Sequence, residues 1–491
     1  MKKLCAIWML SGCLLTVFAG KIQIAAVPDA GSEKGEVCRL SFKSGQAQNR
    51  QTADARMILP ITVAGEGMTP SVKLYEVTKD GAEKYLTTVT IKTKFSAITF
   101  LITDWFNAHS DLAEFSFVVR QTESPAPAVS PKPGAKAQVV VDTTEKPLYT
   151  LAEMMTPVWE SSTVTWETAL PISVDGKTPE ASLLFAPVGE VVVCDYALDK
   201  TYKNGTDFVL SGKTIRLTES SPIPSLTYKQ LYPDSADAPP KTFKSWKGGY
   251  VAFTEGNYWN DRQLAVTYEH ADKWDGPIPS SGEKQLLKTK EALRNGESLK
   301  VLLLGDSIST GASASGKAGK PPFVPGFGEL LIDHLQAGSE SEITFVNASL
   351  GGMVSSWGLT VAPYYAAPEK ADLCLLGFGM NDGGGVPVAQ YIANTKKTME
   401  LIRAENPDVE FILIASFLPN GNWRSLSPMN GYLAALKELE SKTVAVADVW
   451  SMHEYFLKTK RYCDMTGNHV NHPNDFMVRV YAQVIVALLE Q

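Results

Sequence analysis

The chain has 491 residues, about three times the length of a typical domain, so we expect two or three domains. Hydrophobic residues make up 44% and charged residues 20%, which is ordinary for a protein that buries globular cores. The formal net charge is -7, and no basic stripe is present that could follow a phosphate backbone. Nucleic acid is therefore not an expected partner.

The first 20 residues have the order of a secretory signal peptide. Lys2 and Lys3 precede an apolar run at 4–18, and small residues follow this run. The run is too short for a membrane span, which needs about 20 residues, so we expect no integral membrane span. Residues 10–13, Leu-Ser-Gly-Cys, also resemble a bacterial lipobox in which Cys13 carries a lipid. We expect an exported protein (periplasmic, cell-surface or extracellular), with simple secretion favoured and a lipid anchor at Cys13 as the alternative.

Residues 22–121 predict a small β-sandwich. The β-rich runs at 72–78 and 85–91 are joined through Asp80-Gly81, which is a good hairpin signal. Residues 122–138 contain prolines that alternate with Ala, Ser and Lys. Such a segment cannot pack a core and predicts an extended linker.

Residues 139–282 predict a second β-rich, sandwich-like domain. Its short strand-like runs lie at 183–185, 191–194, 207–210 and 214–217. Half of the ten tryptophans of the chain fall in this region: Trp159, Trp166, Trp246, Trp259 and Trp274. A sandwich core is the favoured role for these rings, and stacking on sugar rings is the alternative.

Four cysteines remain after removal of a signal peptide: Cys38, Cys194, Cys374 and Cys463. An even number permits disulfides in an exported protein. They are far apart in the sequence, and Cys374 lies in an apolar strand-like run, where a thiol acts as a small hydrophobic group. We therefore favour free, mostly buried thiols.

Residues 283–491 predict an α/β domain. A helix is expected around residues 286–293, and a helical periodicity runs from Val388 to Ile402. The strand-like runs lie at 301–304, 343–346, 373–376, 411–414 and 444–449. Strands that are apolar on both faces and alternate with helices predict a parallel sheet covered on both sides. Chemistry in such sheets gathers at the carboxyl ends of the strands.

Glycine and polar residues follow the ends of the first three of these strands. Ser307 comes directly after the first strand, at the start of the next helix, where backbone N–H groups can bind an oxyanion. Gly352 follows the second strand and permits a close backbone approach to a ligand. Asn381 follows the third strand, and its side-chain amide can donate to the same oxyanion.

His472 precedes an amphipathic helix that begins near Phe476. The positive end of a helix dipole favours neutral imidazole over the charged form. Neutral imidazole is the form that takes a proton from a serine hydroxyl. The sequence therefore predicts Ser307 as a nucleophile and His472 as its base.

Taken in chain order, these motifs resemble those of the SGNH (GDSL-type) hydrolases. The matching residues are Gly305-Asp306-Ser307, Gly352, Gly379-x-Asn381-Asp382 and His472-Pro473-Asn474. The resemblance covers about residues 299–489 and implies a flavodoxin-like three-layer α/β/α domain. It implies ester hydrolysis through an acyl-enzyme on Ser307, with His472 as base and with no metal or other cofactor. It also implies an oxyanion hole from the backbone N–H groups of Ser307 and Gly352 and the Asn381 side chain.

One position departs from the family pattern. The family usually has Asp three residues before its histidine, and here that position holds His469. Asp464 is our candidate for the acid that orients His472, and a Ser307–His472 dyad oriented by a backbone carbonyl is the alternative. Asp475 lies in the first helical turn and is interpreted as a cap. His469 is expected to support the site or to face the substrate.

The resemblance extends to the layout, since β-rich regions ahead of the hydrolase domain are similar to bacterial secreted members that act on polysaccharides. We expect an esterase that removes acyl groups, foremost acetyl, from a small-molecule or polysaccharide ester. A lipase, lysophospholipase or thioesterase of the same family is one alternative, and it predicts a wide apolar channel beside Ser307. A catalytically inactive glycan-binding surface protein is the alternative from another class.

Overall fold

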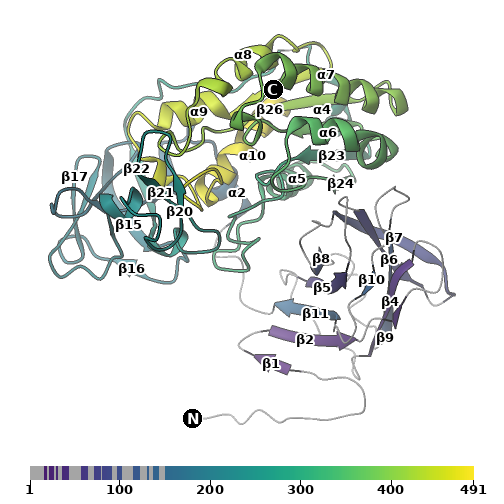
Figure 1. Cartoon of the computed structure of the whole chain (residues 1–491), viewed down its shortest axis with the longest axis horizontal. Helices are drawn as coiled ribbons and strands as arrows, with labels where there is room; N and C mark the ends of the chain where they lie inside the picture. Colours follow the sequence, from purple (N-terminus) through teal and green to yellow (C-terminus); the bar gives the residue numbers. More distant parts are fainter. Residues whose placement is uncertain are drawn as a thin grey trace. The chain divides into compact units, whose positions relative to one another are not determined.

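The computed structural model describes residues 150–282 and 284–490, together with segments of the preceding region (Figure 1). Those segments are residues 16–18, 21–26, 29–30, 36–43, 57–64, 71–78, 80–90, 97–101, 114–121, 130–131 and 137–142. The chain divides into two compact units, Met1–Pro147 and Leu148–Gln491.

The first unit is built from antiparallel sheets. One sheet has the strand order β3-β4-β9-β6-β7, and another has the order β1-β2-β11-β5-β10 with β8 beside β5. The strands are β1 Thr16–Phe18, β2 Lys21–Ala26, β3 Asp29–Ala30, β4 Glu36–Lys43, β5 Met57–Ala64, β6 Ser71–Val77, β7 Glu83–Thr90, β8 Ala97–Leu101, β9 Glu114–Gln121, β10 Ser130–Pro131 and β11 Ala137–Asp142. The hairpin expected through Asp80-Gly81 is confirmed: β6 and β7 pair antiparallel, and Gly81 adopts a φ of +84° in the turn.

Part of the N-terminal sequence expectations lies outside the described residues. This holds for Cys13, for most of the expected signal peptide and for most of the expected linker at 122–138. Within that linker β10 pairs with β5, and β11, which begins at the end of the linker, pairs with both β2 and β5. The chain therefore still contributes strands to the first unit as far as Asp142.

In the second unit, residues 150–282 form what we call the β-rich module. Its sheets have the orders β12-β22-β15-β16 and β17-β18-β14-β13-β19, and β20 and β21 form a separate hairpin. The strands are β12 Thr163–Ala169, β13 Ile172–Ser173, β14 Glu180–Ser182, β15 Pro187–Asp195, β16 Thr201–Tyr202, β17 Phe208–Ser211, β18 Thr214–Leu217, β19 Leu226–Thr227, β20 Thr242–Lys244, β21 Tyr250–Ala252 and β22 Leu264–His270. The short helices are α2 Leu151–Met155, α3 Tyr228–Leu231 and the 3-10 turn η1 Asn260–Arg262.

One predicted strand of the module is not a strand. The run at 183–185 follows β14 as irregular chain. The Leu183 N–H still donates to a backbone carbonyl, that of Lys213 (2.8 Å). The next two N–H groups donate to side chains instead: Leu184 to the Glu167 carboxylate (2.9 Å) and Phe185 to the Tyr268 hydroxyl (3.2 Å). Apolar composition alone could not show that side chains take these bonds.

Residues 284–490 form an α/β domain around one parallel sheet of order β24-β23-β25-β26-β27. The strands are β23 Leu299–Gly305, β24 Ile343–Asn347, β25 Leu373–Gly377, β26 Glu410–Ala415 and β27 Val444–Asp448. The helices are α4 Leu287–Asn295, α5 Phe327–Gly338, α6 Ser355–Val361, α7 Val388–Glu405, α8 Tyr432–Lys437, α9 Val449–Phe456 and α10 Asp475–Leu489. The shorter turns are the π-helical η2 Ala362–Ala366 and the 3-10 turns η3 Ala367–Glu369, η4 Asp382–Gly384, η5 Ser427–Met429 and η6 Tyr462–Asp464.

The sheet is the middle of three layers, as expected for a flavodoxin-like domain. Because successive strand residues point to opposite faces, Val301 and Leu303 belong to the core with α5 and α10. Leu302 and Leu304 belong to the other core, with α6, α7 and α8. The strand order is the doubly wound 2-1-3-4-5 order, whose switch point lies beside the first strand, β23.

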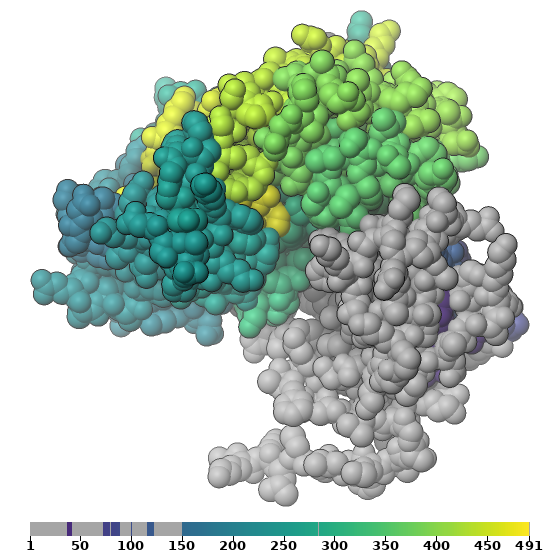
Figure 2. Space-filling view, viewed as in Figure 1, coloured from purple at the N-terminus to yellow at the C-terminus, as the bar shows by residue number. Residues whose placement is uncertain are grey.

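Buried polar contacts join the β-rich module to the α/β domain. Lys460 forms an ion pair with Glu167 of β12, and both side chains are completely buried. Arg479 of α10 is buried and donates to the carbonyls of Thr165 (2.8 Å) and Trp166 (3.0 Å). Figure 2 shows teal atoms of the module directly against yellow atoms of the C-terminal residues. The regions expected as separate domains at 139–282 and 283–491 therefore share one compact unit from Leu148 onward.

Candidate active site

Ser307 lies at the carboxyl end of β23, the strand at the switch point of the sheet. Gly305 is required just before it, because a Cβ there would lie 2.5 Å from the carbonyl oxygen of Gly377 in β25. Asp306 is buried and accepts a hydrogen bond from the Ile308 N–H (3.0 Å), so it fixes the turn around Ser307. Burial raises the pKa of Asp306 to about 7, against the lowering effect of that hydrogen bond.

His472 reaches Ser307 from the loop that precedes α10. Its Nε2 lies 2.8 Å from Ser307 Oγ, which is the distance at which a serine hydroxyl donates to imidazole. The loop holds the ring by its own backbone: the His472 N–H donates to Asn468 Oδ1 (3.0 Å), and the His472 carbonyl accepts from Thr466 Oγ1 (2.8 Å). The two residues, 165 positions apart in the sequence, are brought together as predicted from the motifs.

The two candidate oxyanion-binding turns are tied to each other. Gly352 has a φ of +81°, which favours glycine, and the next residue, Met353, accepts a hydrogen bond from Asn381 Nδ2 (2.9 Å). The buried Asp382 accepts from the Ser355 N–H (3.0 Å), which makes a second link between the turns. An Asn amide has two hydrogens, so Asn381 can hold this contact and still donate to an oxyanion.

The other ring nitrogen of His472 faces two side-chain oxygens. Nδ1 lies 3.2 Å from Oε2 of Glu255 and 3.4 Å from Oγ of Ser313. Glu255 follows β21 of the β-rich module, and its Oε1 accepts from Asn468 Nδ2 (3.2 Å). Sequence reasoning did not single out Glu255, because it lies 217 positions before His472 and belongs to no motif.

Residues 303–479 match the model of the GDSL-like lipase/acylhydrolase family. This segment is a GDSL-like lipase/acylhydrolase domain. An arylesterase of Vibrio mimicus is 30% identical over 116 residues, which are 23% of this chain and 54% of that protein. The chain thus spans about half the length of this curated relative.

Solved structures are also similar to parts of the chain. TesA is 27% identical, covering 30% of this chain and 77% of its own, with a TM-score of 0.26. A two-domain esterase (CEX) described as active on acetylated mannans is 18% identical, with a TM-score of 0.35. The match covers 43% of this chain and 54% of that chain. A variant of Axe2, an acetylxylan esterase from Geobacillus stearothermophilus, is 20% identical, with a TM-score of 0.33. The match covers 39% of this chain and 94% of that chain.

The carboxylate of Asp464 does not contact His472. Asp464 is our candidate for the acid that orients the base of the GDSL-like domain. Oδ1 accepts from the Leu170 N–H (2.7 Å) and Oδ2 accepts from the Arg461 N–H (2.8 Å). The side chain is buried, and burial raises its pKa. Both oxygens therefore serve the backbone of the module and of the turn η6, and Glu255 occupies the position beside His472 in place of Asp464.

Asp475 and His469 have supporting positions in the GDSL-like domain. Asp475, in the first turn of α10, accepts from the Ser315 N–H (2.8 Å). The helix cap itself is Asn474, whose side chain accepts from the N–H of Met477. His469 is completely buried, so it does not face the substrate.

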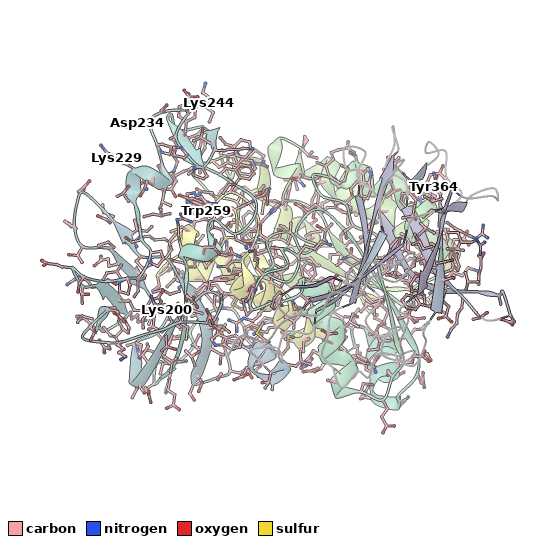
Figure 3. All side chains as sticks on the ribbon, turned by 90° about the horizontal axis from the view of Figure 1, so that it is seen from below. Lys200, Lys229, Asp234, Lys244, Trp259 and Tyr364 are labelled. Atoms are coloured by element: carbon pink, nitrogen blue, oxygen red, sulfur yellow. The ribbon has the colours of Figure 1, made fainter. Side chains whose placement is uncertain are left out.

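The buried His469 anchors the histidine loop to the module. Its Nδ1 donates to the carbonyl of Ala252 at the end of β21 (3.1 Å), and its ring lies 4.5 Å from that of Trp259. Trp259 is fully buried, whereas Lys244 lies at the edge of the module (Figure 3). Burial lowers the pKa of His469 to about 4, so the ring is neutral at neutral pH.

Aromatic side chains border the GDSL-like domain beside this loop. Trp246 and Phe243 of the module and Trp423 of the loop after β26 form what we call the aromatic rim. Trp246 donates from Nε1 to the Gly421 carbonyl (2.9 Å), and the rings of Phe243 and Trp423 lie 5.8 Å apart. The rim continues toward the oxyanion turn, because Arg424 donates to the carbonyl of Met380, the residue before Asn381 (3.0 Å).

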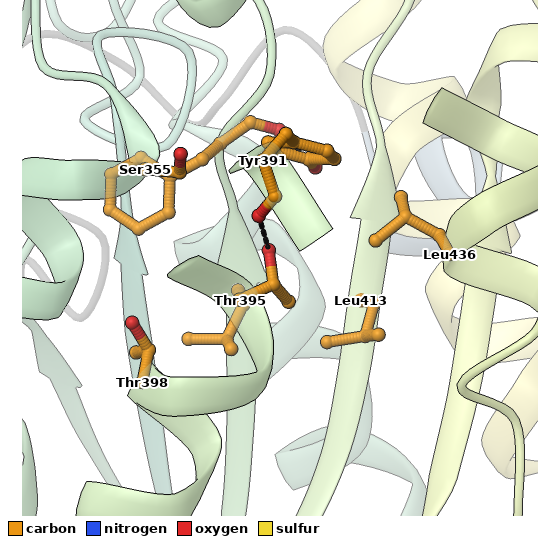
Figure 4. Close-up of a pocket in the computed structure, with 8 residues that line it drawn as sticks. Ser355, Tyr391, Thr395, Thr398, Leu413 and Leu436 are labelled. Carbon is orange, nitrogen blue, oxygen red and sulfur yellow. Dashed lines mark hydrogen bonds between the residues drawn. The ribbon is translucent and has the colours of Figure 1, made fainter. Parts of the chain in front are cut away.

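A small cavity lies behind the oxyanion turns, between the sheet and α7 (Figure 4). It is lined by Ser355, Leu376, Phe378, Tyr391, Thr395, Thr398, Leu413 and Leu436. Its volume is about 10 Å³, which is room for about one water molecule. Neither Ser307 nor His472 is among its lining residues.

Three further findings concern the described part of the chain. No group of three or more His, Cys, Asp or Glu side chains is placed there to hold a metal ion. Cys194, Cys374 and Cys463 are free thiols, as predicted, and Cys374 and Cys463 are buried, as is Cys38. None of the helices found there has both the length and the apolar character needed to cross a membrane.

Proposed function

We propose that this protein is a serine ester hydrolase that removes small acyl groups, foremost acetyl, from a carbohydrate. The observation that carries the reaction is the 2.8 Å contact between Ser307 Oγ and His472 Nε2 within a GDSL-like lipase/acylhydrolase domain. A serine hydroxyl becomes a useful nucleophile only when a neighbouring base removes its proton.

The reaction runs in two halves. His472 takes the proton of Ser307 as Oγ attacks the ester carbonyl, and the oxyanion is held by the Ser307 and Gly352 N–H groups and by Asn381. The C–O bond to the alcohol breaks, and His472 returns the proton to the departing hydroxyl. Water then attacks the acyl-enzyme with His472 again as base, which releases the carboxylic acid and restores Ser307.

The choice of acetyl as the acyl group is taken from the sequence, which resembles bacterial secreted family members that act on polysaccharides. The cavity between the sheet and α7 has no bearing on this choice, because neither Ser307 nor His472 lines it. A lipase of the same family would instead hydrolyse long-chain esters faster than acetyl esters.

The aromatic rim favours a carbohydrate as the alcohol. Trp246 is 57% exposed and Phe243 is 39% exposed, although large apolar side chains are usually covered. Exposed aromatic surface next to a site commonly serves ligand binding, and the apolar C–H face of a sugar ring fits an indole. The expected export of the protein agrees with a polymeric glycan as substrate.

Acetate release from acetylated polysaccharides, together with hydrolysis of p-nitrophenyl esters of increasing chain length, tests this proposal. We expect rates to fall with chain length and to be abolished by Ser307→Ala. Trp246→Ala should raise KM for the polymer and leave hydrolysis of p-nitrophenyl acetate unchanged. The matched control is Tyr364→Ala, an exposed aromatic side chain away from the rim (Figure 3). Equal rates for wild type and Ser307→Ala refute the hydrolase, and rates that rise with chain length refute the preference for acetyl.

A further inference from the structure

We propose that Glu255 is the carboxylate that orients His472, so that the β-rich module supplies one residue of the active site. This inference rests on the proposed function, since it assigns a positioning residue for the same reaction. It accounts for the absence of an acidic residue three positions before His472, where the chain has the buried His469.

The contacts of Glu255 fit this role. Its Oε2 lies 3.2 Å from Nδ1 of His472, on the side of the ring opposite Nε2, which lies 2.8 Å from Ser307 Oγ. A donor at Nδ1 and an acceptor at Nε2 define one tautomer, which is the one needed to take the serine proton. The second carboxylate oxygen accepts from Asn468 Nδ2 (3.2 Å), and Asn468 Oδ1 in turn accepts from the backbone N–H of His472. Asn468 therefore holds both the acid and the base.

The other polar groups near the ring cannot replace this carboxylate. Ser313 Oγ, at 3.4 Å from Nδ1, is a neutral hydroxyl and provides no fixed negative charge. Both oxygens of Asp464 are occupied by backbone N–H groups. His469 is neutral when buried and bonds to the Ala252 carbonyl.

The module also holds the loop that carries the base. Gln263 donates from Nε2 to the carbonyls of Cys463 (2.7 Å) and Thr466 (2.9 Å). Thr168 donates to the carbonyl of Asp464 (2.6 Å). These contacts are buried, so they fix the backbone of the loop relative to β12, β21 and β22 of the module. A carboxylate on the module can therefore keep a constant distance to His472.

The proton balance requires no further group. Nδ1–H stays on His472 and is donated to Glu255, while Nε2 receives the Ser307 proton and later returns it. Glu255 remains ionised throughout and stabilises the imidazolium that forms. The Glu255 side chain is 53% exposed, so water screens its charge, and we expect an effect toward the lower end of the range seen for buried triad acids.

The test compares Glu255→Gln, Glu255→Asp and Glu255→Ala in the full chain with p-nitrophenyl acetate as substrate. Glu255→Gln should lower kcat roughly 100-fold and change KM much less, because the amide favours the wrong tautomer. The acidic limb of the kcat/KM profile should move to lower pH, since loss of the charge makes protonated imidazole less stable. Glu255→Asp should retain part of the activity, and added formate should restore part of it in Glu255→Ala.

Glu190→Gln is the matched control, because Glu190 is an exposed carboxylate on β15 of the same module. It should keep wild-type kcat and pH dependence, and circular dichroism should show that all variants are folded. Wild-type kcat and an unchanged pH profile in Glu255→Gln overturn the inference, as does a larger loss in Ser313→Ala than in Glu255→Gln. Absence of hydrolysis by the wild-type protein refutes the proposed function instead, so the two failures are distinguishable.

Discussion

The buried ion pair between Lys460 and Glu167 allows the attachment of the β-rich module to be tested by its stability. The Glu167 carboxylate also accepts from the Leu184 N–H (2.9 Å) and the Tyr268 hydroxyl, and Lys460 also donates to the Ser182 carbonyl (3.1 Å). Removal of one member of such a pair leaves the other charge buried without compensation, which costs about 3–5 kcal/mol. We therefore expect Glu167→Gln and Lys460→Met each to lower the free energy of unfolding by about this amount.

Urea denaturation followed by tryptophan fluorescence measures this loss, with the double variant completing a mutant cycle. Glu167→Gln and Lys460→Met each leave a single buried charge, whereas the double variant leaves none. The double variant should therefore lose less free energy of unfolding than the sum of the two single losses. The control is Lys288→Met, which removes an exposed ion pair with Asp408 and should cost less than about 1 kcal/mol. If Glu167→Gln costs no more than this control, the pair does not hold the module to the domain and our description of the interface is wrong.

Three further predictions concern single residues. Burial lowers the pKa of His469 to about 4 from its ordinary 6.5, so its contribution to stability is complete above pH 6.5 and is lost as the pH falls toward 4. Urea titrations from pH 7 to 4 should therefore show the stability gap between wild type and His469→Gln closing by about 3 kcal/mol, and a constant gap would contradict this. Asn381→Ala should lower kcat for p-nitrophenyl acetate about 100-fold or more through loss of an oxyanion donor, and an unchanged kcat would remove Asn381 from the oxyanion hole. Gly305→Ala forces a Cβ to 2.5 Å from the Gly377 carbonyl and should destabilise by about 1–3 kcal/mol in the same assay, whereas Gly338→Ala, with open space around its Cβ, should stay within about 0.5 kcal/mol.

The α/β domain could be predicted from sequence because its strands are apolar on both faces. The run predicted at 301–304 lies within Leu299–Gly305, and the run at 411–414 lies within Glu410–Ala415. Each end differs by one or two residues, since hydrogen bonding and not hydropathy sets where a strand ends. The run at 183–185 is not a strand, because side chains distant in sequence, Glu167 and Tyr268, accept the N–H groups of Leu184 and Phe185.

The residues that join the β-rich module to the α/β domain could not be recognised from hydrophobic patterns. Lys460, Glu167 and Arg479 are charged, and charged residues are rarely buried unless they are paired. Their pairing depends on contacts between residues roughly 300 positions apart, such as the 293 positions between Glu167 and Lys460. Composition therefore could not show that the β-rich module and the α/β domain pack together within one compact unit.

The site was predictable to the extent that its residues follow strand ends or begin a helix. Ser307 and His472 meet as predicted because the fold places both at the carboxyl end of β23. Asp464 was the nearest carboxylate in sequence, but its position at the end of the turn η6 directs both oxygens to backbone donors. Glu255 belongs to no recognisable motif in the sequence. Its contact with His472 forms only when the β-rich module packs against the α/β domain.

The position of Glu255 is related to the contact between His469 and Ala252. His469 stands where the family usually has its acidic residue. Ala252 and Glu255 are three residues apart on the module (255 − 252), and His469 and His472 are three residues apart on the loop (472 − 469). His469 Nδ1 donates to the Ala252 carbonyl (3.1 Å), which is the buried contact. His472 Nδ1 lies 3.2 Å from Glu255 Oε2, which is the contact at the edge of the site. The two segments are fixed to each other at His469, and the carboxylate and the imidazole three residues further along face each other. An acidic side chain at position 469 would place a charge in this buried anchor, so the histidine there and the carboxylate at 255 are parts of one arrangement.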